Sequence, residues 1–182
     1  MTKDELINEI QIAFKDVILE DGIGLWEGQG IDDYADNKTI LQLRKKDERN
    51  NWQNIAYQDL ADCASSLSFF DAKGMRFHLP KFIMFDILEE ELRIKQNLFS
   101  PDVLFTLSYN LDEEYQQNRF SLLNNPQIQS IIHYLKYKQQ EIIQEYQEYA
   151  IECNTSIEAI YEDTKYIELN ITIEKWKQNF FE

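Results

Sequence analysis

A short run of carboxylates, DDYAD, offers the first candidate chemistry in the sequence. Its acids Asp32, Asp33 and Asp36 have the D-D-x-x-D spacing of clusters that hold magnesium, and on a helix they would share one side. Enzymes built on that cluster are much longer, and this chain has no second segment with metal-binding spacing. We therefore interpret the three acids as a surface patch, and we expect no metal site and no cofactor.

The segment just before these acids holds four of the five glycines, in GIGLWEGQG between residues 22 and 30. Their spacing differs from that of a phosphate-binding loop, no Lys-Ser or Lys-Thr pair directly follows, and Glu27 would repel a phosphate. The segment therefore does not predict a nucleotide site. We expect an irregular loop here, because so many glycines favour backbone freedom over regular structure.

Nucleophilic or metal chemistry would need a histidine beside a carboxylate, a thiol or a hydroxyl. The only histidines are His78 and His133, and the only cysteines are Cys63 and Cys153. The sequence shows no such pairing, so we expect His78 to be a partly buried, hydrogen-bonded ring and both cysteines to be reduced and buried. A cysteine–histidine nucleophile is the alternative, since its members can be distant in sequence.

Three consecutive glutamates, Glu89, Glu90 and Glu91, follow an apolar run. Glycoside hydrolysis needs two carboxylates that face one another across a cleft, whereas adjacent residues on a helix point apart. We therefore predict that these glutamates form a solvated helix face.

Trp26 lies in the glycine-rich segment, beside Glu27 and close to the aspartate cluster. An aromatic ring among carboxylates suits an interface with a cationic partner. A lid residue that packs on the core is the alternative for Trp26, whereas Trp52 and Trp176 are expected in the core.

The charge of the chain limits the ligands that it can take. Its 182 residues include 33 acids and 18 bases, a formal net charge of −15, which disfavours nucleic acid and anionic membranes and favours a basic partner. No apolar stretch approaches the roughly 20 residues that span a bilayer, and the start of the chain lacks the apolar segment of a secretory signal, so we expect a cytoplasmic protein. With 43% apolar residues, the length fits one domain over residues 1–182.

The elements that must position these groups are predicted to be helices. Thr2 and Glu5 have the spacing of a capping box at the start of a first helix. Each of the three prolines, Pro80, Pro101 and Pro126, stands where a helix is predicted to begin, the last two after Ser and Asn caps. The helix after Pro126 is the longest and has one apolar stripe.

Two further segments complete the predicted fold. A helix over residues 54–70 is expected to end near Gly74 in a left-handed conformation. Residues 157–181 are predicted to form a closing helix, although the alternation in KYIELNITIEKW leaves a strand within 160–176 open. Together these elements predict a mainly α fold, a compact single-domain bundle of about six to seven helices.

One stretch resembles a known protein family. LSFFDAKGMRFHLPKFIMFDIL is similar to the phrase F-x-x-x-G-x-R-F-[YH]-L-P-x-[FY] of a bacterial family catalogued only as a domain of unknown function. The similarity extends to GQGIDDY, NNWQNI and NPQIQSIIHYLKY and covers most of residues 1 to about 140, with His78 and Lys81 where Tyr and Ala would be expected. The resemblance implies a shared fold, in which Arg76 bridges to carboxylates or helix ends, and it supplies no catalytic residues.

An acidic single domain without a catalytic signature is typical of a stoichiometric inhibitor, whose carboxylates occupy a basic groove and speed association. We therefore predict an immunity protein that binds and neutralises a cognate toxin, and not an enzyme. A regulatory or scaffold module that binds another helix in an exposed apolar groove is one alternative. The other is an enzyme, either metal-dependent through the aspartate cluster with Asp32 or with a cysteine such as Cys153 as its nucleophile. The expected contacts form two groups. The first is Trp26, Glu27, Asp32, Asp33 and Asp36, and the second, the other candidate face, is Glu89, Glu90 and Glu91 or the glutamates of the long helix.

Overall fold

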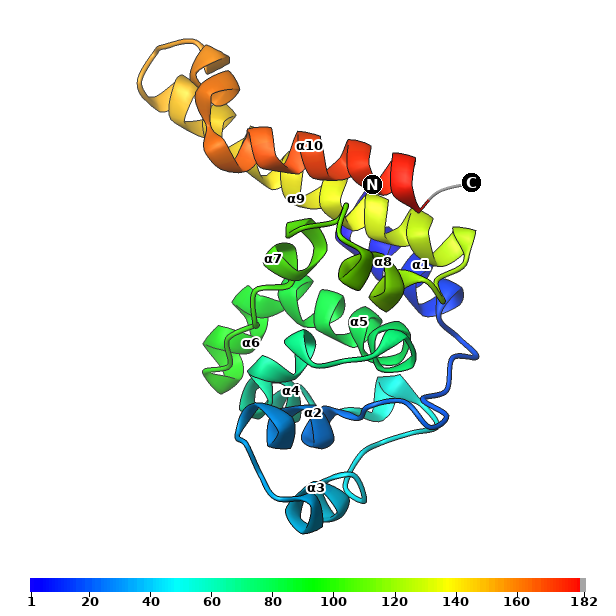
Figure 1. Cartoon of the computed structure of the whole chain (residues 1–182). Coiled ribbons are helices and arrows are strands. Elements are labelled where there is room, and N and C mark those ends of the chain that lie inside the picture. The colour runs from blue at the N-terminus through cyan, green and yellow to red at the C-terminus, as the bar shows by residue number, and fades with distance from the viewer. Residues whose placement is uncertain (181–182) are drawn as a thin grey trace.

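The computed structural model describes residues 1–180, and Phe181 and Glu182 lie outside the described part of the chain. Residues 1–180 form ten α-helices and three short 3-10 helices, with no strand (Figure 1). The prediction of a mainly α fold is confirmed, and a closing helix, not a strand, occupies residues 164–179. The predicted six to seven helices are too few, because the chain also forms short helices in segments that the sequence left irregular or undivided.

Most of the helices are short, and only α5, α9 and α10 exceed eleven residues. None of the helices among the described residues has the length and apolar character needed to cross a membrane. In chain order the elements are α1 (Lys3–Ala13), α2 (Leu25–Asp32), α3 (Asn37–Leu43), η1 (Trp52–Asn54), α4 (Tyr57–Asp62), η2 (Ala64–Ser68), α5 (Ala72–Ile87), α6 (Glu89–Gln96), α7 (Val103–Ser108), α8 (Glu114–Phe120), α9 (Asn125–Glu152), η3 (Ile157–Glu162) and α10 (Thr164–Asn179).

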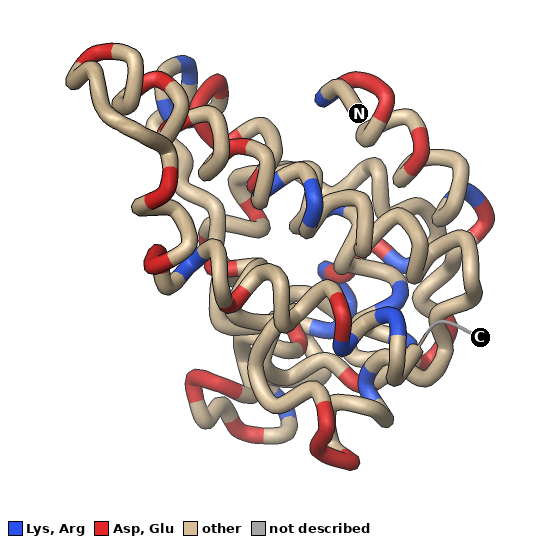
Figure 2. The backbone as a smooth tube through the Cα atoms, turned by 90° about the horizontal axis from the view of Figure 1, so that it is seen from above, with Lys and Arg blue, Asp and Glu red and all other residues tan. Residues whose placement is uncertain are grey.

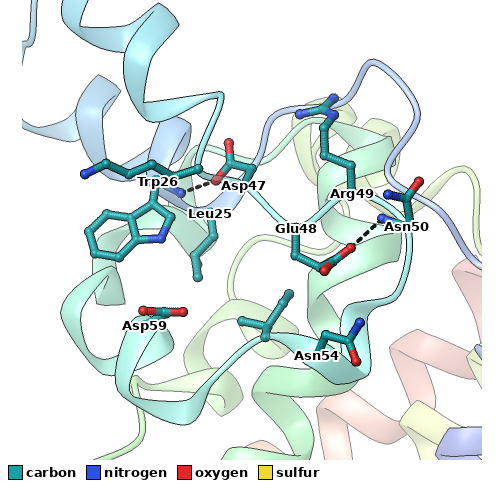
Figure 3. Close-up of a pocket in the computed structure, with 10 residues that line it drawn as sticks. Leu25, Trp26, Asp47, Glu48, Arg49, Asn50, Asn54 and Asp59 are labelled. Atoms are coloured by element: carbon teal, nitrogen blue, oxygen red, sulfur yellow. Dashed lines mark hydrogen bonds between the residues drawn. The ribbon is translucent and has the colours of Figure 1, made fainter.

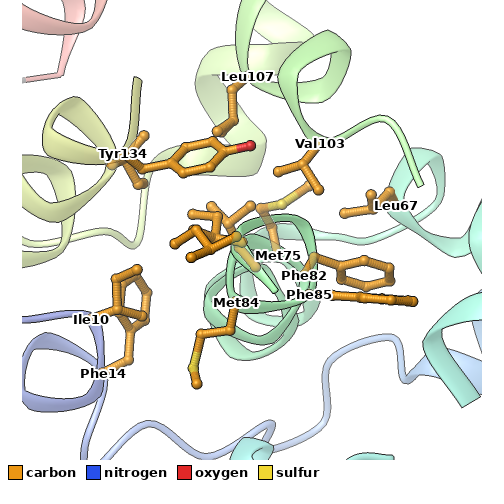
Figure 4. Packing of buried hydrophobic residues seen from close by; sticks show 14 of the residues in the cluster. Ile10, Phe14, Leu67, Met75, Phe82, Met84, Phe85, Val103, Leu107 and Tyr134 are labelled. Carbon is orange, nitrogen blue, oxygen red and sulfur yellow. The ribbon is translucent and has the colours of Figure 1, made fainter. Parts of the chain in front are cut away.

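The centre of the molecule is α5, which other elements surround. Twelve of its sixteen residues are buried, and it contacts α1, α6, α7, α8 and η1. Figure 4 looks along α5 and shows Phe14 at the end of α1, Leu107 of α7 and Tyr134 of α9 around it. Because a helix that is apolar on all sides must be enclosed, α5 fixes the positions of the helices that cover it.

Two residues that resemble helix boundaries lie inside α5. Gly74 is in its first turn, where its N–H donates a hydrogen bond to Asp71 Oδ1 at 2.7 Å, and no glycine among residues 1–180 has a positive φ. A Cβ on residue 74 would lie 2.5 Å from the carbonyl oxygen of Ile23, so the close approach of that loop requires glycine. Pro80 lies in the middle of the helix and cannot donate to the carbonyl of Arg76. The predictions that Gly74 ends a helix and that Pro80 begins one are therefore wrong, because the enclosure of α5 outweighs these local costs.

Other predicted helix starts lie within two residues of the observed ones. The capping box is confirmed, since Glu5 N–H donates to Thr2 Oγ1 at 3.2 Å and Thr2 N–H donates to Glu5 Oε2 at 2.7 Å. Asn124 caps α9 one residue before the predicted cap, and Asp102 caps α7 two residues after the predicted cap. The single helix expected over 54–70 is divided into α4 and η2.

Two tryptophans join distant parts of the chain, and their predicted burial is confirmed. Trp52 Nε1 donates a hydrogen bond to the carbonyl of Phe14 at 2.8 Å, and Trp176 Nε1 donates to that of Leu107 at 2.7 Å. Both indoles therefore fill the core while their single polar atoms stay satisfied. One hydrophobic cluster draws residues from α1 through α10.

The second half of α9 leaves the body of the molecule. This helix has 28 residues, and all of its buried residues lie between Gln127 and Leu135. Beyond them it pairs with η3 and the first half of α10, and Figure 1 shows this hairpin projecting past α6 and α7. Inside the hairpin, Tyr146 Oη donates a hydrogen bond to Asp163 Oδ2 at 2.9 Å. We call residues 141–171 the arm.

Arg119 is a buried cation whose removal is expected to destabilise the fold. Its guanidinium donates to the carbonyls of Phe70, at 3.3 Å, and Leu67, and to Gln116 Oε1 at 2.7 Å. Arg119→Ala leaves these buried acceptors without a donor, so the free energy of unfolding measured by urea denaturation should fall by about 3 kcal/mol or more. The control is Arg93→Ala, since the Arg93 side chain is exposed and has no hydrogen bond or ion pair within residues 1–180. Equal small losses for both variants would contradict the argument.

Candidate functional site

A cavity of about 450 Å³ lies where the start of α2 meets the segments on either side of η1. Figure 3 shows the indole of Trp26 and the carboxylate of Asp59 on one side of it and Glu48 on the other. Leu25 and Ile55 supply the apolar part of its lining. We call this cavity the Trp26 pocket, and its lining is Leu25, Trp26, Lys46, Asp47, Glu48, Arg49, Asn50, Asn54, Ile55 and Asp59.

One wall of the pocket is α2, in the segment that was predicted to be an irregular loop. That prediction is wrong because α2 receives its cap from elsewhere in the chain. Gly24 at the N-cap has no side chain, and Asp47 Oδ1 accepts a hydrogen bond from Trp26 N–H at 2.7 Å in its place. Glu27 Oε2 accepts a second one from Gly24 N–H at 3.3 Å. A Cβ on residue 24 would lie 1.9 Å from Asp47 Oδ2, so only glycine leaves room for this cap.

The carboxylate of Asp47 is confined by this arrangement. The residue is 9% exposed, and its Oδ2 atom has no hydrogen-bond partner. Burial raises the pKa of Asp47 from 3.8 to about 6, although the backbone N–H groups of Trp26 and Glu27 act in the opposite direction. The Asp47 cap therefore stabilises the start of α2, but the buried negative charge that it carries near neutral pH lowers the stability of the folded chain.

Two arginines hold the loop that precedes α2. Arg44 Nη1 forms an ion pair with the buried Glu27 at 2.5 Å, and Arg44 Nη2 donates to the carbonyl of Asp21 at 2.8 Å. Arg49 Nη2 donates to the carbonyl of Glu20 at 2.6 Å. The two arginines therefore connect the segment that lines the pocket to α2 and to the loop before it, across more than fifteen positions of sequence.

The polar groups of the Trp26 pocket suit the binding of a cation. The ammonium of Lys46 lies 5.0 Å from the centre of the Trp26 ring. Asp59 has no hydrogen bond or ion pair from its side chain within residues 1–180, whereas Glu48 Oε1 accepts bonds from the N–H groups of Asn50 and Asn51. An aromatic face beside an unpaired carboxylate attracts a positively charged group.

The structure separates the first group of predicted contact residues. Only Trp26 lines the pocket, because Glu27 is buried in its ion pair. Asp32 and Asp33 are at the end of α2. Asp36 is the N-cap of α3, where its side chain accepts a hydrogen bond from the backbone N–H of Thr39. Among residues 1–180 no group of three or more His, Cys, Asp or Glu side chains is placed to hold a metal ion.

The second predicted group lies in the first turn of α6, outside the Trp26 pocket. Glu90 and Glu91 are exposed and Glu89 is partly exposed. Glu91 pairs with Lys3 at 2.5 Å and with Lys95 at 3.6 Å. Their role as partner contacts stays a prediction.

The two histidines have different surroundings. His78 is fully buried, not partly as predicted, with its Nδ1 2.8 Å from the carbonyl of Gly74 and its ring stacked on Phe70. Burial lowers the pKa of His78 to about 4, which keeps the ring neutral. His133 lies 2.9 Å from the carboxylate of Glu9, a pairing between α9 and α1 that no sequence pattern indicates.

The two cysteines are free thiols. Cys63 is buried as predicted, and burial raises the pKa of its thiol to about 12, so it stays protonated. The predicted burial of Cys153 is wrong, because it follows the end of α9 in the projecting arm and is exposed there.

The sequence model of one protein family, described as "Family of unknown function (DUF6714)", matches residues 2–162. The matched part runs from α1 to η3 and includes every residue that lines the Trp26 pocket. No curated protein and no solved structure matches the chain.

The exposure of the Trp26 ring can be tested by fluorescence. Trp52 and Trp176 are at most 1% exposed, whereas Trp26 is partly exposed beside the pocket. We expect Trp26→Phe to remove most of the tryptophan fluorescence that acrylamide quenches in the folded protein. Trp52→Phe, which removes an enclosed ring, should leave that quenchable signal in place. Undiminished quenching in Trp26→Phe would contradict the pocket geometry.

The raised pKa of Asp47 predicts a specific pH dependence of stability. Because the folded chain holds this proton more tightly than the unfolded chain, the contribution is fully present below pH 3.8 and is lost as the pH rises through about 6. The free energy of unfolding of the wild type minus that of Asp47→Asn should therefore fall by about 3 kcal/mol between pH 3.5 and 7. Urea denaturation across this range measures it.

The matched control for Asp47→Asn is Asp62→Asn, which makes the same change of charge at an exposed side chain of α4. Its difference from the wild type should stay nearly constant across the same range. A constant difference for Asp47→Asn as well would show that Asp47 is not confined as described.

Proposed function

We propose that this chain, which belongs to the family of unknown function DUF6714, is an immunity protein that binds and neutralises a toxin with a basic surface. The observation that supports this proposal is the Trp26 pocket, where an indole, an unpaired carboxylate and apolar side chains surround one cavity. These are the groups that a lysine or arginine side chain of a partner protein needs.

The pocket matches both ends of such a side chain. The aliphatic stem would lie against Leu25 and Ile55, and the charged head would lie between the Trp26 ring and Asp59. Lys46, which now approaches the ring, is exposed, so a partner cation can replace it at little cost in buried contacts.

The pocket is formed before a partner arrives. The start of α2 is held by Asp47 and Glu27, and the loop before it is held by Arg44 and Arg49. Binding would therefore order few additional groups, which favours affinity. The net charge of −15 adds long-range attraction and speeds encounter with a basic partner.

Growth measurements test the proposed function. Each gene that neighbours this one is expressed alone and together with this chain, and the expected result is one lethal product whose toxicity the chain abolishes. The proposal is overturned if no neighbouring product is lethal, or if the chain protects against none of them.

Binding measurements with that purified lethal product test the pocket. Trp26→Ala should weaken the affinity by about 30-fold or more, the loss typical of a central aromatic contact, and Asp59→Asn by roughly tenfold. Asp62→Asn, which lies on the same helix outside the pocket, is the control and should bind like the wild type. Equal affinities for all three variants would rule out the pocket as the contact.

A further inference from the structure

A groove of about 470 Å³ lies at the base of the arm, framed by α7, α9 and α10. Five of its lining residues are apolar: Leu104, Phe105, Leu135, Ile142 and Leu169. Phe105 stacks on Tyr109 and is still 54% exposed, so the groove has an apolar edge that is only partly covered. We propose that this groove docks a basic amphipathic helix of a partner protein.

The charges around the groove favour that occupant. Five acids and two lysines line it. Lys138 is already engaged, because it pairs with Asp86 at 3.3 Å and with Glu141 at 2.6 Å, whereas Lys165 is exposed and has no ion pair within residues 1–180. Glu145 and Glu168 line the same groove, are exposed, and have no hydrogen bond or ion pair from their side chains within residues 1–180. The groove thus offers an apolar lining between unpaired carboxylates, which complements a helix with apolar side chains flanked by lysine or arginine.

The arm adds a strong negative electrostatic field to that of the groove's carboxylates. Residues 141–171 contain eight acids and one lysine, so their net charge of −7 is almost half of the −15 of the whole chain. Figure 2 shows that acids, in red, are also spread over the body, so charge alone does not select a surface. The groove is distinguished by the apolar lining that lies between its acids.

Other occupants of the groove fit less well. A second copy of this chain would bring another arm with a charge of −7 against the first, and like charges at close range oppose association. A nucleic acid or an anionic lipid surface would be repelled in the same way. A cationic amphipathic helix can do both things at once: its basic side chains pair with the free carboxylates, and its apolar side chains cover the exposed ring of Phe105.

This inference goes beyond the proposed function, because the groove and the Trp26 pocket share no residue. Either surface can bind its partner if the other does not.

A synthetic peptide tests the groove without knowledge of the natural partner. The peptide has about 15 leucines and lysines, with the leucines at helical i, i+3 and i+4 spacing, and a scrambled peptide of the same composition is the control. We expect the patterned peptide to bind the full chain at least tenfold more tightly than the scrambled one, as measured by fluorescence anisotropy. Equal binding of the two peptides would overturn the proposal, because it would show attraction by charge alone.

Two double variants locate the binding surface. Glu145→Gln with Glu168→Gln removes the two unpaired carboxylates of the groove, and we expect it to weaken binding of the patterned peptide by about tenfold. Glu158→Gln with Glu162→Gln makes the same change of net charge at exposed glutamates of the arm outside the groove, and should weaken binding by less than about threefold. Equal losses in the two double variants would overturn the proposal.

Two single substitutions complete the test. Phe105→Ala, at the exposed edge of the groove, should weaken peptide binding, whereas Ile151→Ala, at a side chain that is 80% exposed on the arm, should not. Trp26→Ala should leave peptide binding unchanged, which separates this result from that of the toxin experiment. A dimer in sedimentation that Phe105→Ala dissociates would overturn the proposal in favour of a second copy as the occupant.

Discussion

The enclosure of α5 is the constraint on which the rest of the structure depends. Even its polar side chains have partners inside the core. Lys81 donates a hydrogen bond to the carbonyl of Gln53 at 2.9 Å and lies over the ring of Tyr57, and the neutral ring of His78 contacts the carbonyl of Gly74. Because twelve of the sixteen residues of α5 are buried, the helices around it are held in place by covering it. The two candidate binding surfaces lie around this core, the Trp26 pocket at α2 and its flanking segments and the groove between α7, α9 and α10.

The Trp26 pocket depends on a different interaction, the buried carboxylate of Asp47. By capping a helix whose N-cap residue is a glycine, it joins two segments separated by more than twenty residues and holds the backbone of Trp26 in place. A buried charge with one unpartnered oxygen lowers stability near neutral pH, and an asparagine could accept the same hydrogen bond without that penalty. Such a local cost is expected where a site, rather than the core, determines the residue.

The sequence predicted those features that are encoded over a few neighbouring residues. The capping box of Thr2 and Glu5, the proline near the start of α9 and the burial of Trp52 and Trp176 all follow from local pattern. The continuation of α5 through Pro80 could not be read from the sequence, because it depends on packing from five other elements. The same holds for α2, whose cap comes from residue 47, and for the pairing of His133 with Glu9 across 124 positions. Of the predicted contacts only Trp26 lines the pocket, and the sequence could not show that Glu27 is paired with Arg44 or that Asp59 lies on the same side of the pocket as Trp26.

Net charge and binding specificity are separate consequences of the many acids. Several acids are neutralised by the bases of the same chain: Glu20 by Lys73, Glu27 by Arg44, Asp112 by Lys175. These pairs reduce the attraction that the chain can exert at contact, although the remaining excess still acts at a distance. Both proposed sites place an unpaired carboxylate beside aromatic or apolar side chains: Asp59 lines the pocket with Trp26, and Glu145 lines the groove with Phe105. If the two proposals hold, net charge speeds the approach of many basic proteins, and the shape and apolar lining of the two sites determine which of them bind stably.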